Sequence, residues 1–216
     1  MTGEPGTVDA HGTGIAILGG SFNPPHSSHL RLAAAARRCL PVNEVRVIPA
    51  GDHPHKGTRL VAATHRLAMC RLAFAGLADV VVDDRELRRP GPSYTVDTLA
   101  ELQREHPGRR LFFLIGSDNL PLLTTWHDHH RILALATVVT YPRAGHPVDP
   151  ARLDAQRLTS AESSELLAHV LDLPADAVAA SDLRRRWHAG ERELDEIPAP
   201  VRTYMRTHGL YADAAP

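Results

Sequence analysis

Short apolar runs alternate with longer stretches of helical periodicity from residue 14 onward. An apolar run bounded by turn residues is typical of a strand buried on both faces of a parallel sheet. Such runs occupy 14–18, 44–50, 79–84, 110–116 and 136–142. The patterns between them are typical of helices and occupy 29–40, 63–77, 94–106 and 127–136. This alternation predicts a doubly wound parallel α/β sheet with helices on both faces and right-handed crossovers.

The C-terminal part departs from this alternation. It predicts one more strand near 166–173 and two short helices at 181–190 and 199–209, which we expect to form a small cap that closes the sheet edge. The polar stretch 143–163 reads as a loop. The predicted organisation has three parts: a flexible leader (1–13), a single domain (14–211, its C-terminal helical part being about 164–211) and a tail (212–216).

Composition narrows the class of protein. The 216 residues are 43% hydrophobic and carry a formal charge of −1, which favours a globular enzyme over a disordered chain, a collagen or a nucleic-acid-coating protein. No apolar run approaches the roughly 20 residues of a membrane span, and the N-terminus lacks the pattern of a secretory signal. We therefore expect a cytoplasmic protein without nucleic-acid or membrane partners, and a homo-oligomer is compatible with the sequence.

Cysteine and histidine usage gives little sign of a metal site. Cys39 and Cys70 lie in helical stretches, where a thiol behaves as a small apolar side chain. Histidines cluster at 53–55 and 127–130, but the second cluster falls in a predicted helix at spacings that do not converge on one ion. We assign no metal to protein side chains.

Two predicted strands end in small residues suited to a ligand. Ligands of doubly wound sheets bind beyond the carboxyl ends of the strands, where strand order reverses. Gly19, Gly20 and Ser21 follow the first strand, and the segment 116–118 (Gly-Ser-Asp) follows the fourth. If these strands are neighbours, both loops face one crevice.

The stretch GGSFNPPHSSH (19–29) predicts an anion site. Its glycines allow a tight turn, and its prolines lead an extended chain into a helix. His26 and His29 then lie on one side of the helix start, where free N–H groups and the helix dipole attract anions. A phosphate is the expected ligand. The alternative is that both histidines merely cap the helix or fill the core.

Two imidazoles suit phosphate chemistry of a particular kind. The loop lacks the carboxylate cluster that usually holds a metal for phosphoester hydrolysis. If the nucleophile is itself a phosphate, it is already anionic and needs no general base, so positioning and charge stabilisation carry the catalysis. The histidines would then stabilise the oxygens of the phosphorus under attack.

Five ordered blocks resemble a known family. GGSFNPPHSSH resembles the signature G-G-[ST]-F-[DN]-P-x-H-x-G-H of the nucleotidylyltransferase superfamily. Four further blocks narrow the resemblance to bacterial nicotinate-nucleotide adenylyltransferases: IPAGDHPHKG, PSYTVDTL, FLIGSDNLPLLTTWHDHHRIL and VRTYMRTHGLY. The resemblance covers 15–211 and implies a Rossmann-like fold.

The resemblance implies transfer of AMP from ATP to nicotinate mononucleotide, with Mg²⁺, giving nicotinate adenine dinucleotide and pyrophosphate. His26 and His29 resemble the residues that stabilise the transferring phosphate. The resemblance further implies a nucleotide and phosphate site made of Gly19, Gly20, Ser21, Phe22, Lys56, Gly116, Asp118, Ser181 and Arg184. Ordinary alternatives are a solvated loop lysine for Lys56 and helix N-caps for Asp118 and Ser181.

The acceptor is expected on the other side of the cleft. Ser93, Tyr94 and Thr95 open a helix whose N–H groups and hydroxyl could bind a carboxylate. Trp126 is similar to the family's tryptophan that stacks on the pyridine ring, although tryptophan is also a common core residue.

Three positions depart from the family pattern. Ser28 replaces the signature's last glycine, and its hydroxyl can still donate a hydrogen bond to a phosphate. Ala179 and Ala180 replace two hydroxyl residues of the late phosphate motif I-S-S-T-x-I-R, and His127 stands where the family often has tyrosine. Two alternatives therefore stay open: a nucleotidylyltransferase with a different phosphorylated acceptor, and a nucleotide-binding homologue with weak catalysis.

Overall fold

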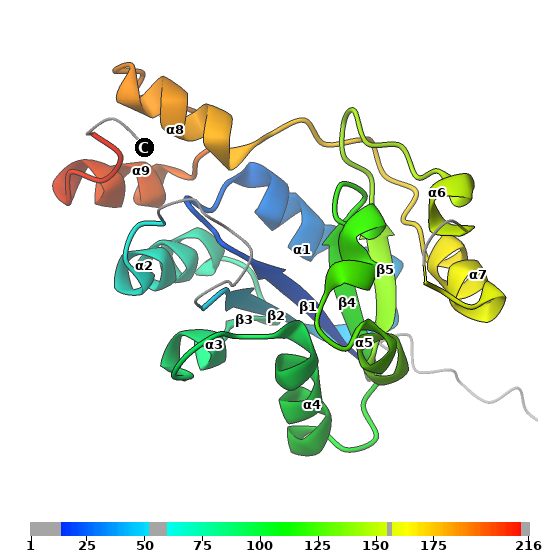
Figure 1. Cartoon of the computed structure of the whole chain (residues 1–216). Helices are drawn as coiled ribbons and strands as arrows, with labels where there is room; N and C mark the ends of the chain where they lie inside the picture. Colours follow the sequence, from blue (N-terminus) through cyan, green and yellow to red (C-terminus); the bar gives the residue numbers. More distant parts are fainter. Residues whose placement is uncertain (1–13, 52–59, 155–156, 213–216) are drawn as a thin grey trace, which may run out of the picture.

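Five parallel strands form one sheet, in the order β3-β2-β1-β4-β5 (Figure 1). The structure is a computed structural model that describes residues 14–51, 60–154 and 157–212. The strands confirm the five predicted apolar runs: β1 (Gly14–Gly20), β2 (Val42–Pro49), β3 (Val80–Val82), β4 (Leu111–Gly116) and β5 (Thr137–Tyr141). The predicted parallel sheet is therefore present, with β1 at its centre.

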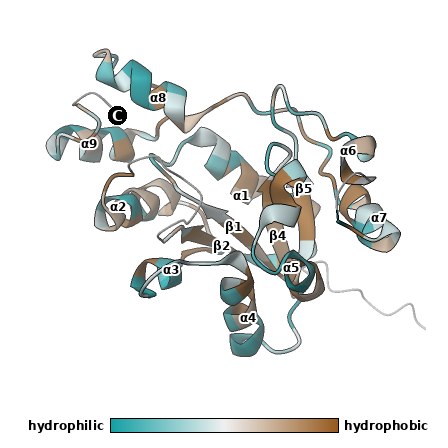
Figure 2. Ribbon diagram, viewed as in Figure 1, coloured by the Kyte–Doolittle hydropathy of each residue, from teal (hydrophilic) through white to brown (hydrophobic). Residues whose placement is uncertain are grey.

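Alternate residues of each strand build two separate cores, because successive side chains point to opposite faces of a sheet. Ala16 and Leu18 of β1 belong to the first core, and Ile15 and Ile17 to the second. The strands are buried and apolar, whereas polar residues gather on the helices around them (Figure 2). Both faces need cover, which explains why the strands read as continuous apolar runs.

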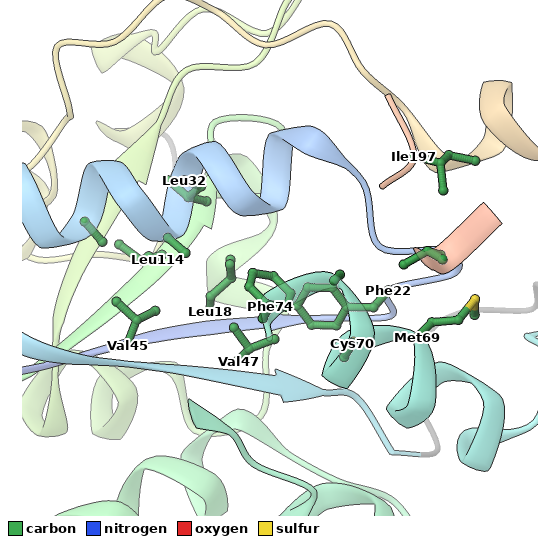
Figure 3. Close-up of a cluster of buried hydrophobic side chains, with 14 of the residues drawn as sticks. Leu18, Phe22, Leu32, Val45, Val47, Met69, Cys70, Phe74, Leu114 and Ile197 are labelled. Carbon is green, nitrogen blue, oxygen red and sulfur yellow. The ribbon is translucent and has the colours of Figure 1, made fainter. Parts of the chain in front are cut away.

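Helices α1 (Ser27–Cys39) and α2 (Ala63–Phe74) cover the first core. Figure 3 shows part of it, where Phe22 and Phe74 meet edge to face at 6.3 Å between ring centroids. Cys70 lies in this core as expected, but Cys39 is exposed: it shares the helix face of Leu32 and Ala36, yet it is the last residue of α1, where the burial of that face has ended.

The second core lies under α4 (Thr95–Glu105) and α5 (His129–Leu135). The prediction of a helix over 127–136 begins too early, because Asp128 takes a left-handed conformation and its carboxylate caps the helix at Arg131 N. Two short elements escaped prediction: α3 (Arg85–Arg88) and the 3₁₀ helix η1 (Leu120–Thr125). Neither is long enough to show helical periodicity.

The region after β5 corrects two expectations. The predicted loop 143–163 contains α6 (Pro150–Asp154) and the start of α7 (Ser160–Ala168). The predicted strand at 166–173 is wrong, because Thr159 and Glu162 form a capping box that starts α7 and carries helix through Ala168. Only Val170 retains strand character, as an isolated parallel bridge to Thr140.

The C-terminal helices α8 (Ala180–His188) and α9 (Ala199–Thr207) confirm the predicted helical cap but not its place. Their buried side chains, including Trp187 and Met205, belong to the same core as α1 and α2. Helix α9 lies beside α2, and both α8 and α9 are on the opposite side of the molecule from β5 (Figure 1). The cap therefore extends a helix layer instead of closing the sheet edge.

Within the described ranges, no helix combines the length and apolar character that a membrane span requires. The division into leader, domain and tail stays a prediction, since residues 1–13 and 213–216 lie outside those ranges.

Candidate active site

Two cavities open at the carboxyl ends of the central strands. The first, of about 280 Å³, is called here the Trp126 cavity; Gly19, Gly116 and Trp126 are among its lining residues. The second, of about 520 Å³, is called the histidine cavity because His26 and His29 line it. Tyr141, at the end of β5, lines both. Because β1 and β4 are paired neighbours, the loops that follow them face one crevice, as predicted.

The loop after β1 reverses at Phe22 instead of at the glycines. Gly19 and Gly20 belong to the strand, whereas Phe22 has a φ of 45° in the left-handed region. Phe22 is buried, and its ring lies 4.7 Å from that of His29 between centroids. Burial of the Phe22 ring therefore offsets the unfavourable backbone conformation of this residue. The same ring packs against His29, one of the two predicted catalytic residues.

His26 and His29 lie face to face at the start of α1. Their ring centroids are 3.9 Å apart, and the planes are tilted by 39°. The backbone N–H of His26 donates to His29 Nδ1 at 3.1 Å. Neutral His29 must therefore carry its proton on Nε2, which makes Nε2 a donor for an anionic ligand.

Both imidazoles are held neutral at pH 7. Burial lowers the pKa of His26 from 6.5 to about 4, and the positive charge of Arg143 adds to this effect. Burial also lowers the pKa of His29 well below its usual value, with contributions from His26 and Arg143. The two rings therefore act as neutral hydrogen-bonding groups, and the positive charge that an anionic ligand would meet comes from arginines that line the cavity, such as Arg143.

Arg143, just after β5, lines the histidine cavity and was missed by the sequence reasoning. Its guanidinium donates from Nη2 to the Val178 carbonyl at 3.1 Å, and its backbone N–H donates to Ser117 Oγ at 2.9 Å. The signal that could have found it is its position at the end of a parallel strand, at the edge where the other loops meet.

Gly116 is required by close packing of the same edge. A Cβ at this position would lie 2.2 Å from Asp118 Oδ1 and 3.1 Å from Arg143 Cγ. Asp118 lines the histidine cavity and accepts from Asn119 Nδ2 at 3.2 Å. It is not an N-cap, because η1 follows Asn119 and has no side-chain cap.

Three of the predicted nucleotide residues, Ser21, Ser181 and Arg184, line neither cavity. The Ser21 carbonyl accepts from Arg66, which anchors the loop after β1. Arg184 donates to the Asn23 carbonyl at 2.8 Å and so supports the same loop from α8. Ser181 is exposed in the first turn of α8, where Ala179 is the N-cap. Lys56 lies outside the described residues.

The predicted acceptor residues line the Trp126 cavity together. They are Ser93, Tyr94, Thr95 and Trp126, joined by His127. Helix α4 begins at Thr95 without a side-chain cap, so its first N–H groups lack helical partners. Trp126 is half-buried and meets Phe113 edge to face at 5.9 Å, which leaves part of the indole available to the cavity.

Glu86, in α3, is a second lining residue that the sequence reasoning missed. Its carboxylate accepts from Thr98 Oγ1 at 2.8 Å and from the Gly51 N–H at 3.3 Å. Burial raises the pKa of Glu86. The residue ties the chain after β2 to α4, so it shapes the wall of the Trp126 cavity.

The described residues contain no group of three or more histidine, cysteine, aspartate or glutamate side chains placed to hold a metal ion. His130 instead pairs with Glu162, with 2.7 Å between Nδ1 and Oε1. The histidines at 53–55 lie outside the described residues.

Known proteins resemble this chain in sequence and fold. The cytidylyltransferase-like family matches residues 17–186. A protein of Albidiferax ferrireducens, named a probable nicotinate-nucleotide adenylyltransferase, is 42% identical over 200 residues, covering 93% of this chain and 98% of that protein. One of the same name from Thermomicrobium roseum is 39% identical over 198 residues, covering 91% of each.

Solved structures share the fold. The nicotinic acid mononucleotide adenylyltransferase of Plasmodium falciparum, complexed with NaAD, superposes with a TM-score of 0.74 and covers 93% of this chain and 98% of that one. Its sequence identity is 17%, so this likeness concerns the fold alone.

The low pKa of His26 predicts a pH dependence of stability. Between pH 6.5 and about 4, the unfolded chain binds a proton at His26 that the folded chain does not, so stability is present above pH 6.5 and is lost as pH falls. From pH 7 to 5 the native chain should lose about 2 kcal/mol more unfolding free energy than His26→Gln.

Urea unfolding at the two pH values measures this difference. His188→Gln, which removes an exposed imidazole at the end of α8, is the matched control and should behave as the native chain does. Equal losses in the native chain and His26→Gln would contradict the assignment of His26 as a buried neutral imidazole.

Proposed function

The chain belongs to the nicotinate-nucleotide adenylyltransferases of the cytidylyltransferase-like family, and we propose on this basis that it transfers AMP from ATP to nicotinate mononucleotide. The products are nicotinate adenine dinucleotide and pyrophosphate, so the reaction serves NAD biosynthesis. One observation carries the proposal: paired neutral histidines line a cavity that shares Tyr141, at the end of β5, with the cavity of Trp126.

ATP fits the histidine cavity by charge. His26 and His29 stand at the first turn of α1, and Arg143 reaches the cavity from the end of β5. Imidazole N–H groups, a guanidinium and a helix N-terminus are the usual partners of phosphate oxygens. Asp118 lines the same cavity, where its carboxylate suits a ribose hydroxyl.

Nicotinate mononucleotide fits the Trp126 cavity by shape and polarity. The indole of Trp126 offers a flat apolar face to a pyridine ring. The uncapped first turn of α4, with Ser93 and Thr95 beside it, offers donors to the carboxylate. The acceptor's phosphate then points toward the strand ends that the two cavities share.

The chemical step needs positioning more than proton transfer. An oxygen of the acceptor's phosphate attacks the α-phosphorus of ATP, a new P–O bond forms, and the bond to the bridging oxygen breaks to release pyrophosphate. The attacking oxygen is already anionic, so no base is required. Neutral His29 donates from Nε2 to the α-phosphate, and Arg143 balances the charge that develops.

Mg²⁺ is proposed to enter with ATP. Its ligands would be mainly phosphate oxygens and water, because the described residues offer no cluster of three suitable side chains. Two carboxylates line the histidine cavity, Asp118 and Asp176. Asp176 already accepts hydrogen bonds from Ser28 and Arg31, so Asp118 is the carboxylate that could contact the ion. The ion would neutralise charge on the triphosphate.

A second candidate is a nucleotidylyltransferase with another phosphorylated acceptor. The observation that favours it is His127, which lines the Trp126 cavity and packs against Tyr94 at 4.5 Å between ring centroids. A histidine at this point changes the polarity of the wall that faces the acceptor. Nucleotide binding with weak catalysis is the third outcome that experiment must separate.

The decisive assay supplies ATP and Mg²⁺ with a panel of acceptors and separates the products by chromatography. Nicotinate mononucleotide should give a dinucleotide and pyrophosphate, in preference to nicotinamide mononucleotide. Turnover only with a different acceptor would favour the second candidate. Absence of turnover with every acceptor, together with ATP binding, would reduce the protein to a nucleotide-binding homologue.

His29→Ala should lower kcat by about a hundredfold while the Kd for ATP changes little, because the lost donor acts on charge that develops during transfer. Steady-state kinetics and calorimetry measure the two quantities. His188→Ala is the control for loss of a histidine outside both cavities. Equal losses of affinity and turnover would show that His29 only binds ATP.

Trp126→Ala should raise the KM for the acceptor roughly tenfold, the order expected for a lost stacking contact, and leave the KM for ATP nearly unchanged. Trp126→Phe keeps an aromatic face and should show a smaller rise. An acceptor KM that stays at the native value in Trp126→Ala would remove the indole from the acceptor site.

A further inference from the structure

Ser28 is joined to a segment far along the chain. It is 8% exposed, lies between the two histidines in sequence and lines the same cavity. Its hydroxyl donates to Asp176 Oδ1 at 2.7 Å. The sequence suggested that the Ser28 hydroxyl donates to a phosphate, but in the structure it donates to Asp176 instead.

Asp176 gathers three donors. Its Oδ1 accepts from Ser28 and from the Val178 N–H at 2.9 Å, and its Oδ2 accepts from Arg31 Nη2 at 2.7 Å. Arg31 Nη2 also lies 3.3 Å from Ser28 Oγ, so the three side chains close a ring of contacts. Burial opposes ionisation, but these hydrogen bonds lower the pKa of Asp176.

The backbone of the same segment is held from the other side. The Asp176 N–H donates to the Pro142 carbonyl at 3.2 Å, and its carbonyl accepts from the Ala144 N–H at 3.0 Å. Arg143 Nη2 donates to the Val178 carbonyl. Residues 176–178 therefore connect the first turn of α1 with the chain that carries Arg143.

This connection links two departures from the family pattern. The segment leads directly into Ala179 and Ala180, which supply no hydroxyl where the family's late motif has two. The Ser28 hydroxyl, which replaces the signature's glycine, bonds to that same segment. The hydrogen bond from Ser28 thus holds one end of the segment that leads to the two alanines.

We propose that Ser28, Asp176 and Arg31 form a clamp that positions the phosphate-binding wall of the histidine cavity. The clamp holds α1 and the 176–178 segment at a fixed separation, so that His26, His29 and Arg143 are aligned before ATP binds. These three clamp residues are positioning residues, and the assignment deepens the proposed function on which it rests.

Restoring the family's glycine is the sharpest test. Ser28→Gly should raise the Kd of a non-hydrolysable ATP analogue and the KM for ATP roughly fivefold, the order expected for the net contribution of one typical hydrogen bond, without a change in the KM for the acceptor. Ala161→Gly, at the second position of α7 and exposed, is the matched control for a glycine in a first helical turn.

A double-mutant cycle separates positioning from general stability. In the Asp176→Ala background, Ser28→Gly should raise the Kd of the analogue less than twofold, because the interaction is already absent. Unchanged or tighter analogue binding in Ser28→Gly would overturn the clamp. A fivefold loss in both backgrounds, or a lower melting temperature with native affinity, would overturn it as well.

The analogue measurement does not depend on the acceptor. Coupling between Ser28 and Asp176 in analogue binding, without AMP transfer to nicotinate mononucleotide by the native chain, would retain the clamp and reject the proposed function. Transfer by the native chain without coupling would reject the clamp alone.

Discussion

The parallel pairing of β1 with β2 on one side and β4 on the other is the constraint on which the site depends. The pairing with β2 runs along the whole of β1, from Gly14 to Gly20, and the pairing with β4 runs from Ile15 to Leu18. Because the strands are parallel, their carboxyl ends lie at the same edge. The loops after β1, β4 and β5 that line the cavities leave this edge. Hydrogen bonds between the strands therefore bring together the loop of His26 and His29, the turn at Gly116 and Arg143. This arrangement does not depend on a bound ligand.

The site's preorganisation works against the stability of the fold. Phe22 occupies a left-handed conformation, and two imidazoles are buried neutral beside a guanidinium. A strained backbone and buried imidazoles of this kind persist only where the surrounding core over-determines them. Phe22 belongs to the core under α1 and α2, so apolar burial at one end of the loop stabilises the polar arrangement at the other.

Sequence patterns were informative wherever one residue type repeated at a fixed spacing. The strands were predictable because both faces of the sheet are buried, and the histidine pair because its spacing matches a helix turn. The strand at 166–173 was not, because a capping box outweighed the strand-like composition that follows it. Short elements such as α3 gave no periodic signal at all.

Contacts between distant segments set the limit of such prediction. Arg143 and Glu86 line the two cavities, yet each is one of many charged residues in the sequence and stands in no spacing pattern with its partners. Ser28 and Asp176 are separated by 148 positions. Only the three-dimensional structure, in which Asp176 lies against α1, shows that these two residues belong to one hydrogen-bonded unit.

None of the described residues that resemble the family's late motif (178–184) lines the histidine cavity. Arg184 keeps the motif's polar character, but its guanidinium bonds the Asn23 carbonyl and so supports the histidine loop instead of lining the cavity. Arg143, one of the arginines that line the cavity, comes from the end of β5 instead. Since a triphosphate is recognised by charge and donor geometry, the element that supplies each donor is free to vary, provided the sheet edge holds the donors together.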